Sequence, residues 1–168
     1  MFPLHGKADM RLLLAQHGQA VDKQDDPARP LSAAGISDVQ HIARQLGNGG
    51  VRVARVWHSG KLRAEQTAAL LAKQVLRGGK PEATDGIAPN DSVDEFVADV
   101  DVWQEDTLVV GHLPFMARLV ARLVTGDMEH DCVSYTPGTV VCLERVAADR
   151  WVLVWMLRPG LQHGGTPA

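Results

Sequence analysis

The sequence has only two cysteines, and their number and spacing leave little room for disulfide or zinc chemistry. Cys132 and Cys142 lie where we expect late strands, and no Cys-x-x-Cys pair occurs in the 168 residues. A disulfide framework or a structural zinc site needs more cysteines at regular spacings. Free thiols in strands behave as small apolar groups. We therefore expect both cysteines to be buried free thiols and assign them no chemistry.

Long apolar runs and an excess of positive charge are also missing. No segment approaches the roughly 20 apolar residues that span a bilayer, and residues 1–10 contain no long apolar stretch. The formal net charge is -3 and the isoelectric point is about 6.1, so the chain offers no basic field to nucleic acid. We therefore expect neither nucleic acid nor a membrane as a partner, and we expect a cytoplasmic location.

The remaining composition is that of an ordinary globular protein. Hydrophobic residues make up 45% of the chain and charged residues 22%, which is enough for one domain with a substantial core. We expect a single domain over residues 1–168, with loosely ordered tails at 1–10 and 159–168.

Strand and helix patterns alternate along the chain without an internal repeat. Short apolar runs predict strands at residues 11–16, 51–57, 107–110, 139–143 and 151–157, and the last two are predicted to form a hairpin. A further short strand near 82–85 has no obvious partner. Helical spacing follows Ser32, Ser59, Ser92 and His112, and Ser32 and Ser59 are candidate N-caps. This order predicts a three-layer α/β sandwich with a mainly parallel sheet and helices on both faces.

Polar residues follow the ends of the predicted parallel strands. Gln16, His17 and Gly18 follow the first strand, His112 follows the strand at 107–110, and Arg63 lies in the first turn of a predicted helix. Because the carboxyl ends of parallel strands share one edge, these groups should meet there beside helix amino termini, in a place suited to phosphate. A neutral imidazole can attack phosphorus, and Arg63 with a protonated His112 could neutralise the phosphoryl oxygens.

Four segments in this order resemble the histidine phosphatase superfamily, and within it the small SixA-type phosphohistidine phosphatases. They are residues 14–20 (Leu-Ala-Gln-His-Gly-Gln-Ala), 29–35 (Arg-Pro-Leu-Ser-Ala-Ala-Gly), 58–68 (His-Ser-Gly-Lys-Leu-Arg-Ala-Glu-Gln-Thr-Ala) and 109–114 (Val-Val-Gly-His-Leu-Pro). The resemblance implies a phosphoglycerate mutase-like fold and a phosphatase that acts through a phosphorylated histidine. It also implies that no cofactor or metal is required.

By this resemblance His17 is the nucleophile, Arg63 holds the phosphoryl group and His112 is the second histidine of the pocket. Gln16, Gly18 and Arg29 are expected to contact the substrate. Arg29 could instead pair with an aspartate of its own loop, either Asp25 or Asp26. The expected partners are phosphate or another oxyanion in the pocket and a phosphohistidine-bearing protein such as a phosphorelay domain.

The chain departs from the family pattern at two positions. Gln16 replaces the usual arginine before the histidine, which keeps a hydrogen-bond donor and removes a permanent charge. Gly60 stands where the family often has proline, which should loosen the first helical turn without removing chemistry.

A general acid and a metal are the remaining questions about the chemistry. Asp91, Asp94 and Glu95 are candidates for the acid that larger family members use, although acidic residues at a helix start also complement the helix dipole. Phosphohistidine makes an acid less necessary, because imidazole, with a conjugate-acid pKa of about 6.5, leaves readily near neutral pH. A zinc site formed by His17, His58 and His112 is a minor alternative, disfavoured by the nearby arginine.

The sequence leaves three functions open. The first is hydrolysis of phosphohistidine on a protein. The short connections leave little chain for a lid over the pocket, and an open pocket suits a substrate carried by a protein. The second is hydrolysis of small phosphate monoesters, which would need a working acid. The third is a catalytically weak module that binds phosphate or a phosphoprotein, in which Gln16 marks the loss of activity.

Overall fold

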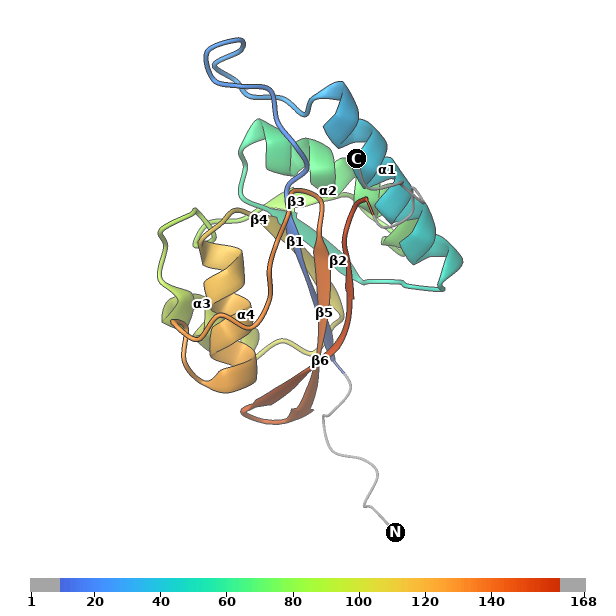
Figure 1. Cartoon of the computed structure of the whole chain (residues 1–168). Helices are drawn as coiled ribbons and strands as arrows, with labels where there is room; N and C mark the ends of the chain where they lie inside the picture. Colours follow the sequence, from blue (N-terminus) through green and yellow to red (C-terminus); the bar gives the residue numbers. More distant parts are fainter. Residues whose placement is uncertain (1–9, 161–168) are drawn as a thin grey trace.

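The computed structural model describes residues 10–160, which form six strands and four helices (Figure 1). In chain order these are β1 (Arg11–Gln16), α1 (Ala33–Asn48), β2 (Arg55–His58), α2 (Leu62–Val75), β3 (Glu82–Ala83), α3 (Val93–Val100), β4 (Thr107–Gly111), α4 (Phe115–Thr125), β5 (Val140–Ala147) and β6 (Arg150–Leu157). Of the expected loose tails, residues 1–9 and 161–168 lie outside the described range. Met10 is buried in the core, so it does not belong to a loose tail.

The six strands form one sheet in the order β3-β2-β4-β1-β5-β6. β3, β2, β4 and β1 run parallel, whereas β5 pairs antiparallel with both β1 and β6. The prediction of a mainly parallel sheet that ends in a hairpin is confirmed, and the short strand β3 pairs with β2. The carboxyl ends of the four parallel strands therefore lie along one edge of the sheet.

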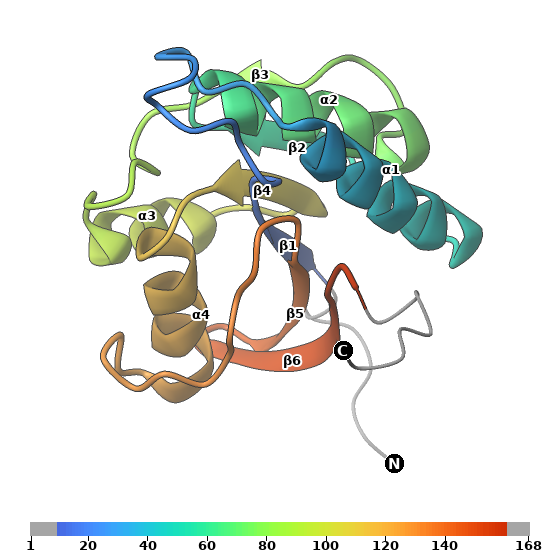
Figure 2. The same cartoon turned by 45° about the horizontal axis from the view of Figure 1, so that its top comes forward.

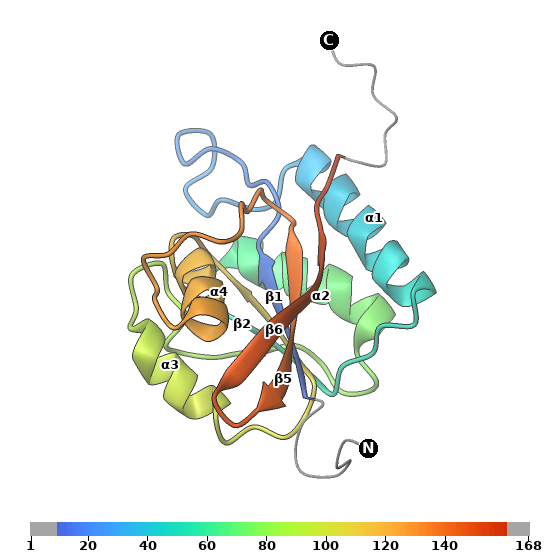
Figure 3. The ribbon, with the colours of Figure 1, turned by 60° about the horizontal axis from the view of Figure 1, so that its bottom comes forward.

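Helices cover both faces of this sheet, α1 and α2 on one face and α3 and α4 on the other (Figures 2 and 3). Alternate side chains of β1 point to opposite faces of the sheet and so enter both hydrophobic cores. Leu12 and Leu14 pack in the cluster that contains α3 and α4, and Leu13 and Ala15 pack in the cluster that contains α1 and α2. Burial on both faces explains why the sequence of β1 is continuously apolar. The predicted three-layer sandwich is confirmed.

One of the two predicted serine caps is confirmed, since Ser32 Oγ accepts a hydrogen bond from the Gly35 N–H at 3.0 Å. The structure also shows a cap at Ser92, whose Oγ accepts from the Glu95 N–H at 3.3 Å. The prediction for Ser59 is wrong, because α2 begins after Lys61 and no side chain caps it. Ser59 bonds His112 instead, and this bond brings it into the candidate site.

Some predicted boundaries also differ. β2 is shorter than expected, since Val53 makes only an isolated bridge to Leu76 before the strand begins. α1 runs through Gly47 to Asn48, and its Ile36 is 37% exposed.

The two cysteines differ from each other. Cys142 is buried in β5, and burial raises the pKa of its thiol to about 12. Cys132 is exposed in a loop, so the expectation of a buried strand position is wrong for this residue. No helix in the described part of the chain is long and apolar enough to cross a membrane.

Candidate active site

The predicted site lies at the edge of the sheet where the parallel strands end, which is its upper end in Figure 1. β4 lies between β1 and β2, so the segments that follow these three strands are neighbours. His17 follows β1, Ser59 follows β2 and His112 follows β4. The strand order thus brings together side chains that are far apart in the sequence.

His17, Arg63 and His112 meet at this edge. The ring centroids of His17 and His112 are 5.0 Å apart, with the ring planes inclined by 51°. Arg63, in the first turn of α2, donates from Nε to Nε2 of His17 over 3.3 Å. The three side chains to which the sequence analysis assigns the phosphoryl chemistry therefore form one cluster.

The hydrogen bonds of His17 define which ring nitrogen is free. Nδ1 lies 2.7 Å from the carbonyl oxygen of Gly18, which can only accept, so Nδ1 carries the proton. The lone pair is consequently on Nε2, the atom beside Arg63. Burial lowers the pKa of His17, and the charges of Arg63 and Arg29 add to this, against the opposing effect of the Gly18 bond. The ring is therefore neutral and can act as a nucleophile at neutral pH.

His112 is neutral in the free site, which corrects the expectation of a protonated second histidine. Burial lowers its pKa to about 3, and the nearby His17 ring and the charges of Arg63, Lys61 and Arg29 contribute to the shift. A bound dianion would favour the imidazolium and raise this pKa. At a pH between the free and the bound pKa, binding takes up a proton. Oxyanion affinity is then expected to rise as the pH falls.

Gly18 is required for close packing. A Cβ atom at Gly18 would lie 2.7 Å from Cγ2 of Val39 on α1, so any side chain there would force Val39 or the loop to shift. The Gly18 N–H donates to Oγ1 of Thr67 at 2.9 Å, and this hydroxyl donates to the carbonyl of Arg63 at 2.7 Å. Thr67 thus connects the loop after β1 to α2. The sequence analysis gave Thr67 no role, although it lies in the third matching segment.

Gln16 lies under the site and is only 7% exposed. Side chains alternate between the two faces along β1, so Gln16 lies on the same face as Leu12 and Leu14, which α3 and α4 cover. His17 continues the alternation on the opposite face, with Leu13 and Ala15. Its Oε1 atom is buried and has no hydrogen-bond partner. A buried polar atom without a partner at the end of the strand is consistent with a group that turns toward a ligand.

If Gln16 contacts the bound anion, Gln16→Arg is expected to tighten tungstate or phosphate binding about five- to thirty-fold, because it adds a permanent charge to that contact. The added cation should also lower the pKa of His112 and move the active range to lower pH. Inhibition constants measured between about pH 5 and 8 test both effects. Unchanged binding across this range would show that the side chain does not face the pocket.

Arg29 lies in the loop between β1 and α1. Its Nε donates to the carbonyl of Val21 at 3.1 Å, and its backbone has the unusual φ of 50°. Within residues 10–160 it makes no ion pair with Asp25 or Asp26, so that alternative is not seen. Its charge acts on both site histidines.

Two of the three candidate acids bond to groups outside the histidine cluster. Asp91 Oδ2 accepts from the Ala88 N–H at 2.8 Å, and Asp94 Oδ1 pairs with Arg122 Nε at 2.9 Å. Glu95 lies in the first turn of α3, the position expected for simple dipole complementarity. In the described structure none of these carboxylates bonds to His17, Arg63 or His112.

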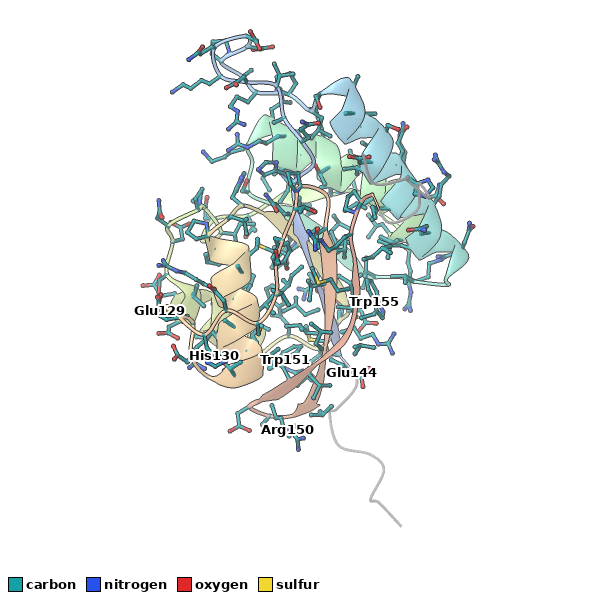
Figure 4. The ribbon with its side chains drawn as sticks, in the orientation of Figure 1. Glu129, His130, Glu144, Arg150, Trp151 and Trp155 are labelled. Atoms are coloured by element: carbon teal, nitrogen blue, oxygen red, sulfur yellow. The ribbon has the colours of Figure 1, made fainter. Side chains whose placement is uncertain are left out.

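The described residues contain no group of three His, Cys, Asp or Glu side chains that could hold a metal ion. Nδ1 of His58 instead accepts from the Gly60 N–H at 3.1 Å, which offers no support for the zinc alternative. His130, in the loop after α4, lies next to Glu129 and away from the strand ends (Figure 4).

Comparisons with known proteins give relatives of similar sequence. No family model matches the chain. The chain is 31% identical over 128 residues to an uncharacterized protein of Picosynechococcus, covering 72% of this chain and 77% of that protein. It is 29% identical over 123 residues to phosphohistidine phosphatase SixA of Escherichia coli, covering 70% of this chain and 76% of that protein.

Solved structures have the same fold. The protein histidine phosphatase SixA complexed with tungstate superposes with a TM-score of 0.79 at 25% identity, covering 89% of this chain and 97% of that one. The alpha-ribazole phosphatase from Shigella flexneri superposes with a TM-score of 0.67 at 19% identity, covering 86% of this chain and 94% of that one.

Proposed function

The chain belongs to the histidine phosphatase superfamily and is a phosphatase of that type, and we propose that it removes phosphoryl groups from phosphohistidine on a protein. The observation that carries the proposal is the state of His17. Its Nδ1 is bound to the Gly18 carbonyl, and its Nε2 carries a lone pair beside Arg63. Such a nitrogen can accept a phosphoryl group.

The reaction proceeds in two displacements. His17 Nε2 attacks phosphorus, the bond from phosphorus to the substrate nitrogen breaks, and the departing imidazole keeps the electron pair and takes a proton. Water then attacks the phosphorus on His17, loses a proton and releases phosphate, and the His17 lone pair is restored. Arg63 stabilises the phosphoryl oxygens in both steps.

The lack of a carboxylate bond to the cluster favours a substrate with an easy leaving group. In the described residues the groups around the two histidines are cations, namely Arg63, Lys61 and Arg29. An alkoxide needs a proton from an acid to leave, whereas imidazole leaves near neutral pH. The phosphohistidine of a phosphorelay domain fits this chemistry, and small phosphate monoesters fit it less well.

Parallel assays on a phosphorylated histidine-containing phosphorelay domain and on sugar phosphates test the proposal. We expect kcat/KM to be at least about a hundredfold higher on phosphohistidine, since no acid assists an alkoxide. EDTA should leave turnover unchanged. Faster hydrolysis of sugar phosphates would instead indicate a monoester phosphatase, and tungstate binding without any turnover would indicate a binding module.

A further inference from the structure

Thr67 is a buried polar side chain on α2, one turn after Arg63, and it is only 1% exposed. Its hydroxyl donates to the carbonyl oxygen of Arg63 at 2.7 Å, and its Oγ1 accepts from the Gly18 N–H at 2.9 Å. The first bond is one that threonine commonly makes inside a helix. The second bond joins residues 49 positions apart in the sequence, and α2 does not need it in order to form.

Thr67 and Gly138 hold the two ends of the peptide group that joins His17 to Gly18. The N–H of this group donates to Thr67, and its carbonyl accepts from the Gly138 N–H at 3.1 Å. The next carbonyl along the chain, that of Gly18, lies 2.7 Å from Nδ1 of His17 and accepts its proton. The backbone that Thr67 fixes therefore also orients the imidazole ring of His17.

The same hydroxyl is bonded to the residue on the other side of the ring. Arg63 lies four residues before Thr67 on α2, and its Nε donates to Nε2 of His17 over 3.3 Å. The Gly18 carbonyl thus faces one ring nitrogen of His17, and the Arg63 guanidinium faces the other. Thr67 is bonded to the backbone of both residues, so one side chain links the groups on the two sides of the ring.

We propose that Thr67 is a positioning residue for phosphoryl transfer, which fixes the attacking Nε2 of His17 relative to Arg63. Attack requires the nitrogen about 3–3.5 Å from phosphorus with its lone pair aligned, and a misplacement of about 1 Å costs about a hundredfold in rate. Thr67 acts through Gly18 and Arg63 and takes no part in the covalent steps. The inference rests on the proposed function only in taking His17 as the nucleophile.

Single-turnover quenching with a phosphorylated phosphorelay domain tests this role. Thr67→Val keeps the shape of the side chain, removes the hydroxyl and leaves the Gly18 N–H without its partner. We expect phosphorylation of His17 to slow about ten- to a hundredfold. Tungstate affinity, measured by calorimetry, should change by less than about threefold, because anion binding depends less than attack on the direction of the Nε2 lone pair.

A second pair of variants isolates the hydroxyl even where Thr67→Val does not fold. Thr67→Ser and Thr67→Ala both lack the methyl group, and they differ from each other only in the hydroxyl. Thr67→Ser should phosphorylate His17 at least about tenfold faster than Thr67→Ala. Equal rates in these two variants would show that the hydroxyl does not position the ring.

Thr107→Val is the matched control. Thr107 is also fully buried, and its hydroxyl accepts from Arg55 at 3.0 Å and donates to the Glu105 carbonyl at 2.8 Å. It lies at the start of β4, at the opposite end of the strand from His112. This variant should lower the unfolding temperature, because buried hydrogen bonds are lost, and should leave the rate of His17 phosphorylation unchanged.

Three results would overturn the proposal: a wild-type rate of phosphorylation in Thr67→Val, equal losses of rate and tungstate affinity in that variant, or an equal loss of rate in Thr107→Val. A wild-type protein that phosphorylates His17 from sugar phosphates but not from phosphohistidine would overturn the proposed function instead. The inference about Thr67 would stand, because Thr67→Val should then slow phosphoenzyme formation from sugar phosphates by the same factor.

Discussion

His17→Ala is expected to abolish the phosphoenzyme and to lower kcat/KM by at least about a thousandfold. The reason is that the substitution removes Nε2, the atom that must form the bond to phosphorus. Arg63 and His112 would still bind the phosphoryl group in the variant. Substrate binding should therefore fall much less than turnover.

Rapid quenching after brief incubation with substrate measures this directly. The wild-type protein should yield an adduct that is stable in base and labile in acid, as expected for a phosphorylated nitrogen, and the variant should yield none. His130→Ala, which changes an exposed loop residue, is the control and should behave as wild type. An adduct that persists in His17→Ala would assign the nucleophile to another residue.

Arg63→Lys should lose about a hundred- to a thousandfold in kcat/KM, nearly as much as Arg63→Ala. Arg63 Nε already faces His17 Nε2 at 3.3 Å. The planar guanidinium can reach two phosphoryl oxygens at once, whereas a lysine ammonium offers one point of contact and is more strongly hydrated. Charge alone therefore should not restore the rate.

Steady-state kinetics of the two variants on the same phosphohistidine substrate make this comparison. Arg118→Lys is a suitable control, because Arg118 lies on α4 and its side chain is 43% exposed beside Glu129. That variant should keep wild-type activity. If Arg63→Lys recovered most of the rate, a contact to two oxygens would be wrong, and Arg63 would act only through its charge.

The sequence predicts the strands of the sheet and the positions of His17 and His112 at its edge, because both can be recognised from where the buried apolar runs begin and end. β1 and β4 are buried on both faces, so they read as continuous apolar runs, and the polar residues that end them mark the edge of the sheet. Parallel strands place their carboxyl ends together by topology alone. The meeting of His17 and His112 could therefore be expected before any distance was known.

The partners of Ser59 and the charge of His112 could not be read from the sequence. A serine before a helix can cap the helix or bond to another group. Ser59 bonds to His112 because the neighbouring strands β2 and β4 end side by side, and the sequence does not give that distance. The low pKa of His112 arises from burial together with cations from two separate segments, the start of α2 and the loop after β1. Both properties exist only in the assembled site.

The central position of β1 also determines how firmly His17 is anchored. β1 pairs with β4 on one side and β5 on the other, and its apolar side chains enter both cores. Amide hydrogens in such a strand exchange with solvent only when the whole domain opens, whereas loops open locally at little cost. His17 therefore follows the slowest-exchanging part of the molecule, while Arg29 lies in the loop that projects beyond the body of the fold (Figure 1).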